Sequence, residues 1–114
     1  MADYLVLTLD VDDLELQTAF WCGALGYEHQ GDAGQFRALS DPSGASPRML
    51  LQRVHDVKAG KNRLHIDIHV ADVEAEAARL VALGAAVTGR QAEHGLEWVV
   101  LADPEGNEFC IVPS

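Results

Sequence analysis

The sequence predicts an α+β fold built from two βαβββ modules that follow each other along the chain. In each half, an alternating apolar segment is followed by an Asp, a helical stretch that ends in Ala-Leu-Gly, and an Asp-Pro-x-Gly turn. The glycines that end the helical stretches, Gly26 and Gly84, lie 58 residues apart, and the turns that begin at Asp41 and Asp103 lie 62 residues apart. Signals that return in one order at nearly one spacing indicate a duplicated structural unit.

Each module is expected to begin with a strand, at 4–11 in the first and at 63–70 in the second. Apolar residues occupy every second position of both segments, beginning at Leu5 and at Leu64. A period of two is that of a strand with one buried face. The opposite faces then carry Tyr4, Val6 and Thr8 in the first module and His65, Asp67 and His69 in the second.

A helix is expected after each opening strand. Asp12 or Asp13 can cap the first helix and Asp72 the second, because a short acidic side chain accepts from the free N–H groups of a first helical turn. Gly26 and Gly84 then supply the left-handed residue that ends a helix. The stripes expected to face the sheets are Leu14, Thr18, Trp21 and Leu25 in the first helix and Val73, Ala77 and Leu80 in the second.

Three further strands are expected in each module. They cover 27–30, 35–39 and 48–54 in the first module and 85–88, 96–102 and 108–112 in the second. Gly31 and Gly34 are assigned to the first hairpin turn, and Asp-Pro-x-Gly suits the next turn because Pro fixes φ and Gly accepts a positive φ. The modules, 3–55 and 63–114, are joined by a linker at 56–62 and are expected to make one domain over 1–114.

Composition excludes several classes of protein. The chain has 114 residues, of which 48% are hydrophobic and 23% charged, as in a globular protein rather than a disordered one. Its formal net charge of −10 should repel nucleic acid and anionic membranes and favour neutral or cationic ligands. Cys22 and Cys110 form no C-x-x-C pair, which favours a reducing compartment. Because the chain shows no basic leader and no apolar run of about 20 residues, we expect a cytoplasmic protein.

One helix can cover only one face of its module's sheet, so the other face is left bare. We expect the two bare faces to form a curved mixed sheet around a groove. The polar sides of the opening strands would line that groove, which would hold a small molecule.

Three parts of the chain carry recognisable motifs. They are Val11-Asp12-Asp13-Leu14 with Phe20-Trp21-Cys22-Gly23-Ala24-Leu25-Gly26, then Lys61-Asn62-Arg63-Leu64-His65-Ile66-Asp67, and Asp103-Pro104-Glu105-Gly106-Asn107-Glu108-Phe109-Cys110. These motifs resemble those of the vicinal oxygen chelate (VOC) superfamily, which includes glyoxalase I, bleomycin-resistance proteins and extradiol dioxygenases. The last run is similar to a glyoxalase-like subgroup. The resemblance spans nearly the whole chain and implies the glyoxalase/bleomycin-resistance/dioxygenase fold and a homodimer.

The metal enzymes of that superfamily take one ligand from each opening strand and one from each closing strand. The matching positions in this chain are Val6, Gln52, His65 and Cys110. Val6 cannot bind a metal, Gln52 is a weak oxygen ligand, and a Cys110 thiolate would favour zinc or another soft metal. The resemblance therefore implies His65, Gln52 and Cys110 as ligands of a divalent Zn, Ni, Mn or Fe ion. Because the set is incomplete, we expect no tightly held metal.

The candidate catalytic residues follow from the same comparison. His65 would be the base or metal ligand, with Gln52 as its polar partner and Cys110 as a third group. Asp67 could orient a neighbouring imidazole and raise its basicity. One structural alternative is that only His65 reaches the groove, while Asp67 and His69 lie near its rim and are satisfied by water or backbone. Another is that Cys110 fills the core.

Other residues are candidates for ligand contacts. Trp98 could stack on an aromatic or cationic ligand, or it could fill the core. Tyr4, Val6 and Thr8 share one face of the first opening strand and could contact a ligand from there. Asp67 and Cys110 complete the ligand-binding set.

Two classes of function remain open at this point. The resemblance implies a lyase, isomerase or dioxygenase step on a small oxygenated organic substrate. The alternative is a metal-free protein that sequesters a ligand, as antibiotic-resistance members of the superfamily do, and the acidic charge suits a cationic antibiotic. A dimer with a vestigial groove is a third alternative.

Overall fold

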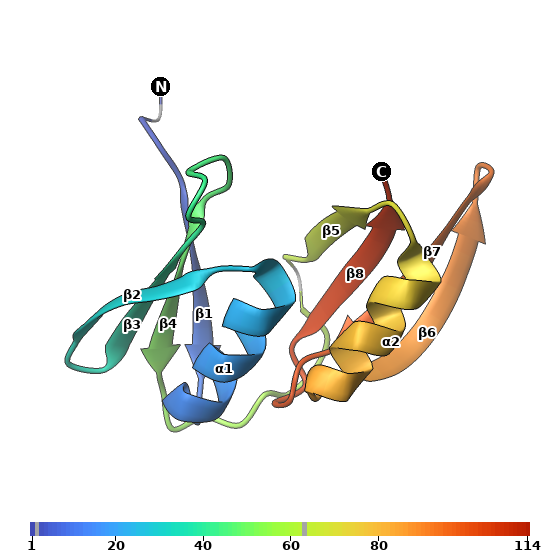
Figure 1. The fold of residues 1–114 in the computed structure, drawn as a ribbon. Coiled ribbons are helices and arrows are strands. Elements are labelled where there is room, and N and C mark those ends of the chain that lie inside the picture. Colours follow the sequence, from blue (N-terminus) through green and yellow to red (C-terminus); the bar gives the residue numbers. More distant parts are fainter. Residues whose placement is uncertain (2, 63) are drawn as a thin grey trace. The chain divides into compact units, whose positions relative to one another are not determined.

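The computed structural model describes residues 1, 3–62 and 64–114, and it divides into two compact units, Met1–Val57 and Lys58–Ser114. The boundary lies inside the predicted linker at 56–62. Each unit contains one strand, one helix and three further strands in that order (Figure 1). The predicted α+β fold with two βαβββ modules is therefore confirmed.

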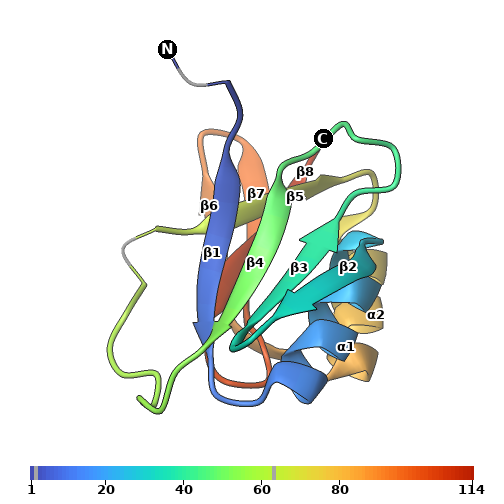
Figure 2. The same ribbon diagram turned by 90° about the vertical axis from the view of Figure 1, so that its left-hand side faces the viewer.

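The N-terminal unit is a four-stranded mixed sheet with one helix. Its elements are β1 (Val6–Val11), α1 (Leu14–Leu25), β2 (Glu28–Ala33), β3 (Phe36–Ser40) and β4 (Arg48–Arg53). The strand order is β1-β4-β3-β2, and β1 runs parallel to β4 while the other neighbours are antiparallel. Helix α1 lies against one face of this sheet (Figure 2).

The C-terminal unit repeats this arrangement. Its elements are β5 (Ile66–Val70), α2 (Val73–Leu83), β6 (Ala86–Glu93), β7 (Leu96–Ala102) and β8 (Glu108–Pro113). The strand order is β5-β8-β7-β6, again with one parallel pair, β5 with β8. Neither helix has the length and hydropathy needed to cross a membrane, within the residues described.

Both helices begin and end as the sequence predicts. The Asp13 carboxylate accepts from the Leu16 N–H at 3.0 Å, and the Asp72 carboxylate accepts from the Ala75 N–H at 3.0 Å. Gly26, with φ of 70°, ends α1 in the left-handed conformation that favours glycine. The helix bounds are thus set by local hydrogen bonding on both sides.

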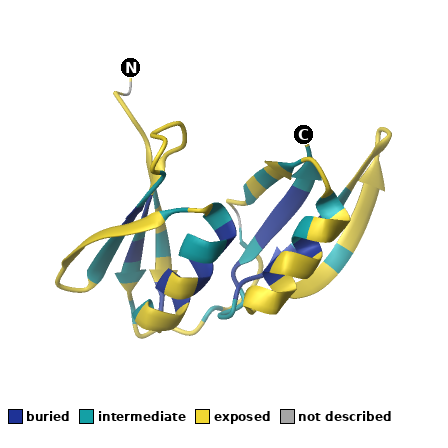
Figure 3. Cartoon of the chain, viewed as in Figure 1, coloured by how far each residue is buried: buried dark blue, intermediate teal, exposed yellow. Residues whose placement is uncertain are grey.

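The core of each unit lies between the helix and one face of its sheet (Figure 3). In the N-terminal unit, Phe20 and Trp21 of α1 are buried, with ring centroids 5.1 Å apart and nearly perpendicular planes. Alternate strand residues face the helices and are almost fully buried: Leu39, Met49 and Leu51 in the first unit, and Val99, Leu101, Phe109 and Ile111 in the second. Each sheet thus has one covered face, as predicted.

The opening strands are shorter than the alternation predicts. β1 begins at Val6, which pairs with Arg48 at the start of β4, so Tyr4 and Leu5 precede the sheet and are exposed. β5 begins at Ile66, which pairs with Phe109 of β8. A period of two describes where side chains point, but the strand ends where its partner ends. The predicted strand residue Arg63 lies outside the described residues.

The β2–β3 and β6–β7 hairpins are longer than predicted. β2 continues to Ala33 and β6 continues to Glu93, so Gly31 lies in a strand and not in the turn. The register of each hairpin shifts once, between His29 and Gly31 and between Val87 and Gly89. A bulge of this kind breaks the alternation of side chains, which is why the sequence pattern ends too early.

The two Asp-Pro-x-Gly turns form as predicted but differ in burial. In each turn the Gly N–H donates to the Asp carbonyl at 2.9 Å. The Asp103 carboxylate is 4% exposed and accepts from the N–H groups of Glu105 and Asn107, both at 2.9 Å. The Asp41 carboxylate makes the corresponding bonds to Ser43 and Ser46 at an exposed site.

We expect Asp103→Ala to lower the free energy of unfolding by about 2–3 kcal/mol, because it leaves buried N–H groups without an acceptor. Urea denaturation followed by circular dichroism measures this loss. Asp41→Ala is the matched control in the duplicated turn and should cost clearly less, because water can replace the lost acceptor there. Equal losses at both positions would contradict this explanation.

Candidate functional site

The candidate site lies on the sheet face that α2 does not cover, which we call the C-terminal open face. Phe109 and Ile111 are buried on the covered side, so Cys110 between them points to the open face. By the same alternation in β7, Trp98 and Val100 point to the open face. The residues of this face used below are Asp67 and His69 of β5, Glu108, Cys110 and Val112 of β8, Trp98 and Val100 of β7, and Gly89 and Gln91 of β6.

One row of residues crosses the middle of the C-terminal open face from edge to edge. Asp67 pairs with Cys110, Cys110 pairs with Val100, and Val100 pairs with Gly89. The row therefore begins with the carboxylate of Asp67, continues with the thiol of Cys110 and the isopropyl group of Val100, and ends at Gly89, which has no side chain. We call these four residues the central row.

The Asp67–Cys110 contact is the chemically distinctive part of the central row. Cys110 is 6% exposed, while its pairing partner Asp67 on β5 is exposed and places a carboxylate beside the thiol. Burial raises the pKa of the Cys110 thiol, the negative charge and hydrogen bond of Asp67 raise it further, and Glu108 adds to this. The Lys61 ammonium opposes these effects. The thiol is therefore held protonated, as a hydrogen-bond donor and not as a thiolate.

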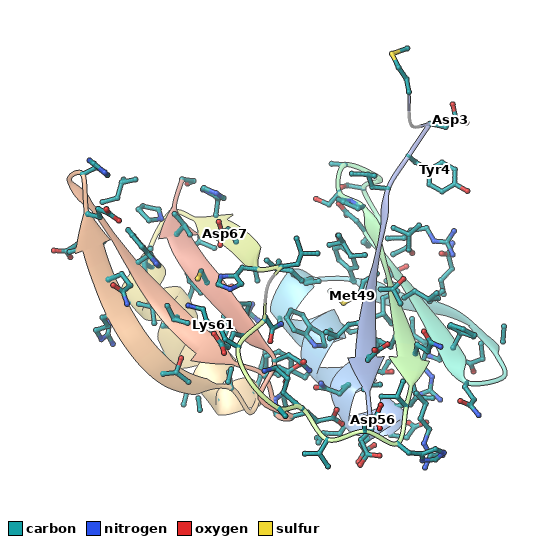
Figure 4. All side chains as sticks on the ribbon, turned by 180° about the vertical axis from the view of Figure 1, so that it is seen from behind. Asp3, Tyr4, Met49, Asp56, Lys61 and Asp67 are labelled. Atoms are coloured by element: carbon teal, nitrogen blue, oxygen red, sulfur yellow. The ribbon has the colours of Figure 1, made fainter. Side chains whose placement is uncertain are left out.

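Figure 4 labels both Lys61, on the segment before β5, and Asp67, on β5. The sequence-based prediction did not place Lys61 or Glu108 in the candidate site. Glu108 precedes Cys110 by two residues on one strand, so alternation alone would have placed both on one face. Lys61 lies outside regular structure, and no periodic signal points to it.

His65 lies immediately before β5 and is exposed. Its Nε2 atom is 2.8 Å from the carbonyl oxygen of Asn62, so Nε2 carries the proton and donates it to this bond. That contact leaves Nδ1 as the acceptor of the neutral ring. A backbone carbonyl thus orients His65, a role for which the sequence suggested the Asp67 carboxylate. Asp67 instead lies beside the Cys110 thiol.

Trp98 is half-buried, and it also contributes to a pocket of about 540 Å³. This pocket lies where the first turn of α2 meets β6 and β7, and Glu74, Arg90 and Glu97 contribute to its lining. An ion pair between Arg90 and Glu74 joins α2 to β6 at this point. The lining does not include His65, Asp67 or Cys110, so this pocket is separate from the central row.

The N-terminal unit has an open face with different chemistry. The row that corresponds to the central row consists of Thr8, Leu50, Ala38 and Gly31, joined by the same ladder of strand pairs. Leu50, and not Gln52, thus corresponds to Cys110. Gln52 lies two residues further along β4, where it pairs with Asp10 and Phe36.

The remaining predicted contacts belong to the N-terminal unit. Val6 is 38% exposed at the start of β1, and Thr8 lies on the open face. Tyr4 precedes the sheet and is 76% exposed.

The donor atoms of the described residues do not fit a metal centre. In the described part of the chain, no three His, Cys, Asp or Glu side chains lie close enough to share an ion. Val6, at the position of the fourth ligand, has no donor atom, and the Cys110 thiol is held protonated by Asp67. A bound cation would itself lower the pKa of the thiol, so the argument against a metal at this position rests on Val6 and on the lack of three clustered donors among the described residues.

Comparison with solved structures supports the fold. A glyoxalase/bleomycin resistance protein/dioxygenase family enzyme from Burkholderia phytofirmans PsJN is similar with a TM-score of 0.82 and 18% identity, covering 98% of each chain. A superfamily member from Sphaerobacter thermophilus has a TM-score of 0.77 and 22% identity, covering 100% of this chain and 98% of its own. At these identities the likeness concerns the fold alone.

A third similar structure is a mutant of the fosfomycin resistance protein FosX from Listeria monocytogenes. It was crystallised with Mn(II) and 1S,2S-dihydroxypropylphosphonic acid. Its TM-score is 0.81 at 19% identity, with 98% of this chain and 90% of that chain covered. A comparison with curated protein sequences finds no match.

The family relationship rests on the sequence as well as on the fold. A family model described as a Glyoxalase-like domain matches residues 6–112, which include all eight strands and both helices except the last residue of β8. The two βαβββ modules have the architecture of the superfamily that the sequence motifs resemble. The chain therefore belongs to the Glyoxalase-like domain family of the VOC superfamily.

Proposed function

We propose that this protein binds a small oxygenated organic molecule on the C-terminal open face, and that His65 and Asp67 provide glyoxalase-like proton transfer to it. The pairing of Asp67 with Cys110 in the middle of the sheet face carries the proposal. The corresponding pair in the N-terminal unit is Thr8 and Leu50, so the same fold forms there with neither a carboxylate nor a thiol. A requirement of ligand binding explains the difference between the two units.

The residues of the face have suitable chemistry for such a ligand. The Asp67 carboxylate can accept a hydrogen bond from a hydroxyl or enol group, because an ionised carboxylate is only an acceptor. The Nδ1 atom of a neutral His65 can accept a proton from a carbon acid or a diol, as a general base does. Trp98 and Val100 offer apolar surface to the body of the molecule.

Several site residues are proposed only because the sequence motifs resemble those of the superfamily. Gln52 is proposed as the polar partner of the base, and Tyr4, Val6 and Thr8 as ligand contacts of the N-terminal unit. The groove shared by the two modules, the homodimer and the cytoplasmic location also stay predictions. A divalent metal is plausible for the superfamily, because FosX was crystallised with Mn(II). Since the donor set here does not fit a metal, the proposed chemistry uses none.

Sequestration without turnover is the second candidate function. It is favoured by the apolar Val6 at a ligand position of the metal enzymes and by the lack of three clustered donors among the described residues. The two functions predict the same binding face. They differ in whether the bound molecule is converted. Conversion that His65→Gln abolishes supports the enzyme, and binding without conversion supports sequestration.

We expect small carbonyl, enol and diol compounds that bind this protein to shift backbone amide signals of β5, β7 and β8 in ¹⁵N–¹H correlation spectra. Asp67→Asn should weaken the binding about tenfold, because the ligand loses a charged acceptor. Asp10→Asn, which removes an exposed carboxylate of the N-terminal unit, is the control and should leave the affinity unchanged. Ligands whose signals map to α1 or α2 would contradict the proposed binding face.

The protonation of Cys110 gives a prediction for pH dependence. In a Cys22→Ala background, alkylation of Cys110 by iodoacetamide should be slow at about pH 7–8 and should rise only at more alkaline pH than for a free thiol, because the thiolate is the nucleophile. Asp67→Asn removes a charge that raises this pKa and should move the rate profile to lower pH. Rates are measured by mass spectrometry, with Asp10→Asn in the N-terminal unit as the control.

The same pKa shift has a defined sign for stability. Because folding raises the pKa of Cys110, the fold favours the protonated thiol, and stability should fall as the pH rises above the ordinary thiol pKa. If the pH dependence of stability is the same in Asp67→Asn as in the original protein, the Asp67 carboxylate does not raise the pKa of the Cys110 thiol.

A further inference from the structure

We infer that the C-terminal open face selects a flat organic cation, with its planar body over Val100 and Gly89 and its charged nitrogen at Asp67. This inference rests on the proposed function and adds the chemical class of the ligand. It depends on three features of the face: an empty end of the central row, an aromatic residue beside it, and an acidic opposite end.

The empty end of the row is at Gly89. This glycine has no left-handed φ that would require it, and a Cβ atom built there would meet no atom within 4 Å. Gly89 follows the bulge of the β6–β7 hairpin, as Gly31 follows that of the β2–β3 hairpin, so the bulge accompanies the glycine in both units. Gly89 leaves the sheet surface low beside Val100, so a flat group can lie against the strands.

The size of the row suits a single aromatic ring with a polar group. Neighbouring strands lie about 4.8 Å apart, so the three steps from Asp67 to Gly89 span roughly 14 Å. A ring placed over Val100 and Gly89 leaves the width of one strand, that of Cys110, between its edge and the Asp67 carboxylate. A planar substituent such as an amidinium can bridge that distance.

Trp98 forms the side of this surface. It precedes Val100 by two residues in β7 and so points to the same face, and it pairs with Gln91 in the same hairpin that contains Gly89. A half-buried indole offers an apolar edge to a neighbouring ring and attracts cations over its face. Trp98 thus favours the aromatic body of the ligand, whereas its charged nitrogen lies at the opposite end of the row.

The charge at the opposite end of the row is negative. Asp67 and Glu108 both lie close enough to Cys110 to raise its thiol pKa, and the Lys61 ammonium opposes them. The exposed Asp67 carboxylate can only accept hydrogen bonds, so it pairs with a donor group of the ligand. An amidinium or protonated amine meets both carboxylates favourably, whereas an anion meets them unfavourably.

The N-terminal unit shows which of these features is specific. Its corresponding row also ends in a glycine with free space, Gly31, but it begins with Thr8 in place of a carboxylate. We therefore assign the preference for cations to Asp67 of the C-terminal unit. Gly31 then serves as the matched control for Gly89.

The test compares benzamidinium, benzamide and benzoate, which share one ring and differ in charge. Titrations followed by ¹⁵N–¹H correlation spectra should show that benzamidinium binds most tightly and shifts the signals of Asp67, Gly89, Val100 and the Trp98 indole. Asp67→Asn should weaken benzamidinium about tenfold and benzamide less than about twofold. Gly89→Leu should weaken both, whereas Gly31→Leu should weaken neither.

The outcomes separate this inference from the proposed function. If benzoate binds the same face more tightly than benzamidinium, or if benzamidinium does not bind, the inference about the cation is wrong while the binding face stands. If the compounds that bind shift only signals outside this face, both proposals are wrong. If the Gly89→Leu protein keeps a dispersed spectrum and full affinity, the ligand does not lie over Gly89 and the inference is wrong.

Discussion

Each module has one helix for a sheet with two faces, and this constraint shapes the rest of the structure. The helix buries Leu39, Met49 and Leu51 in the first unit and Leu101, Phe109 and Ile111 in the second. Those contacts supply the apolar burial that stabilises a domain of this size. The opposite face of each sheet does not contribute to this core, so its residues can change while the core stays intact. Function is therefore expected on the open faces.

The duplication makes the divergence of the open faces visible. The two units keep the same strand order, the same parallel pair and the same bulged hairpin, yet the row Thr8–Leu50–Ala38–Gly31 of one corresponds to Asp67–Cys110–Val100–Gly89 of the other. The Asp67 carboxylate and the Cys110 thiol offer less apolar surface for packing than Thr8 and Leu50 at the corresponding positions. Because both rows are compatible with the same fold, we propose that the polar row serves ligand binding.

Much of the fold could be predicted because its signals are local. Asp13, Asp72 and Gly26 act through hydrogen bonds and backbone angles within a few residues, and they are enough to place both helices correctly. The ends of β1 and β5 could not be predicted, since they depend on where β4 and β8 begin. The bulges before Gly31 and Gly89 hide the second half of each hairpin strand, because they break the alternation on which the prediction relies.

The candidate site was predicted in part for the same reason. Alternation was enough to put Asp67 on the face away from the core, whereas for Trp98 both ligand contact and core filling stayed open. The contact between Asp67 and Cys110 depends on the register of β5 against β8, which no local pattern contains. That contact separates a thiolate ligand from a protonated donor, so the chemistry of Cys110 follows only from the tertiary structure.

The most direct measurement is the free energy of unfolding of a chain in which the central row is replaced by its N-terminal counterpart, by Asp67→Thr, Cys110→Leu and Val100→Ala together. If the row exists for ligand binding, this protein should unfold with a free energy equal to or greater than that of the original, and its affinity for ligands of the open face should be lost. A loss of stability greater than about 2 kcal/mol would show that the Asp67–Cys110 pair supports the fold itself, which would contradict the assignment of the central row to ligand binding.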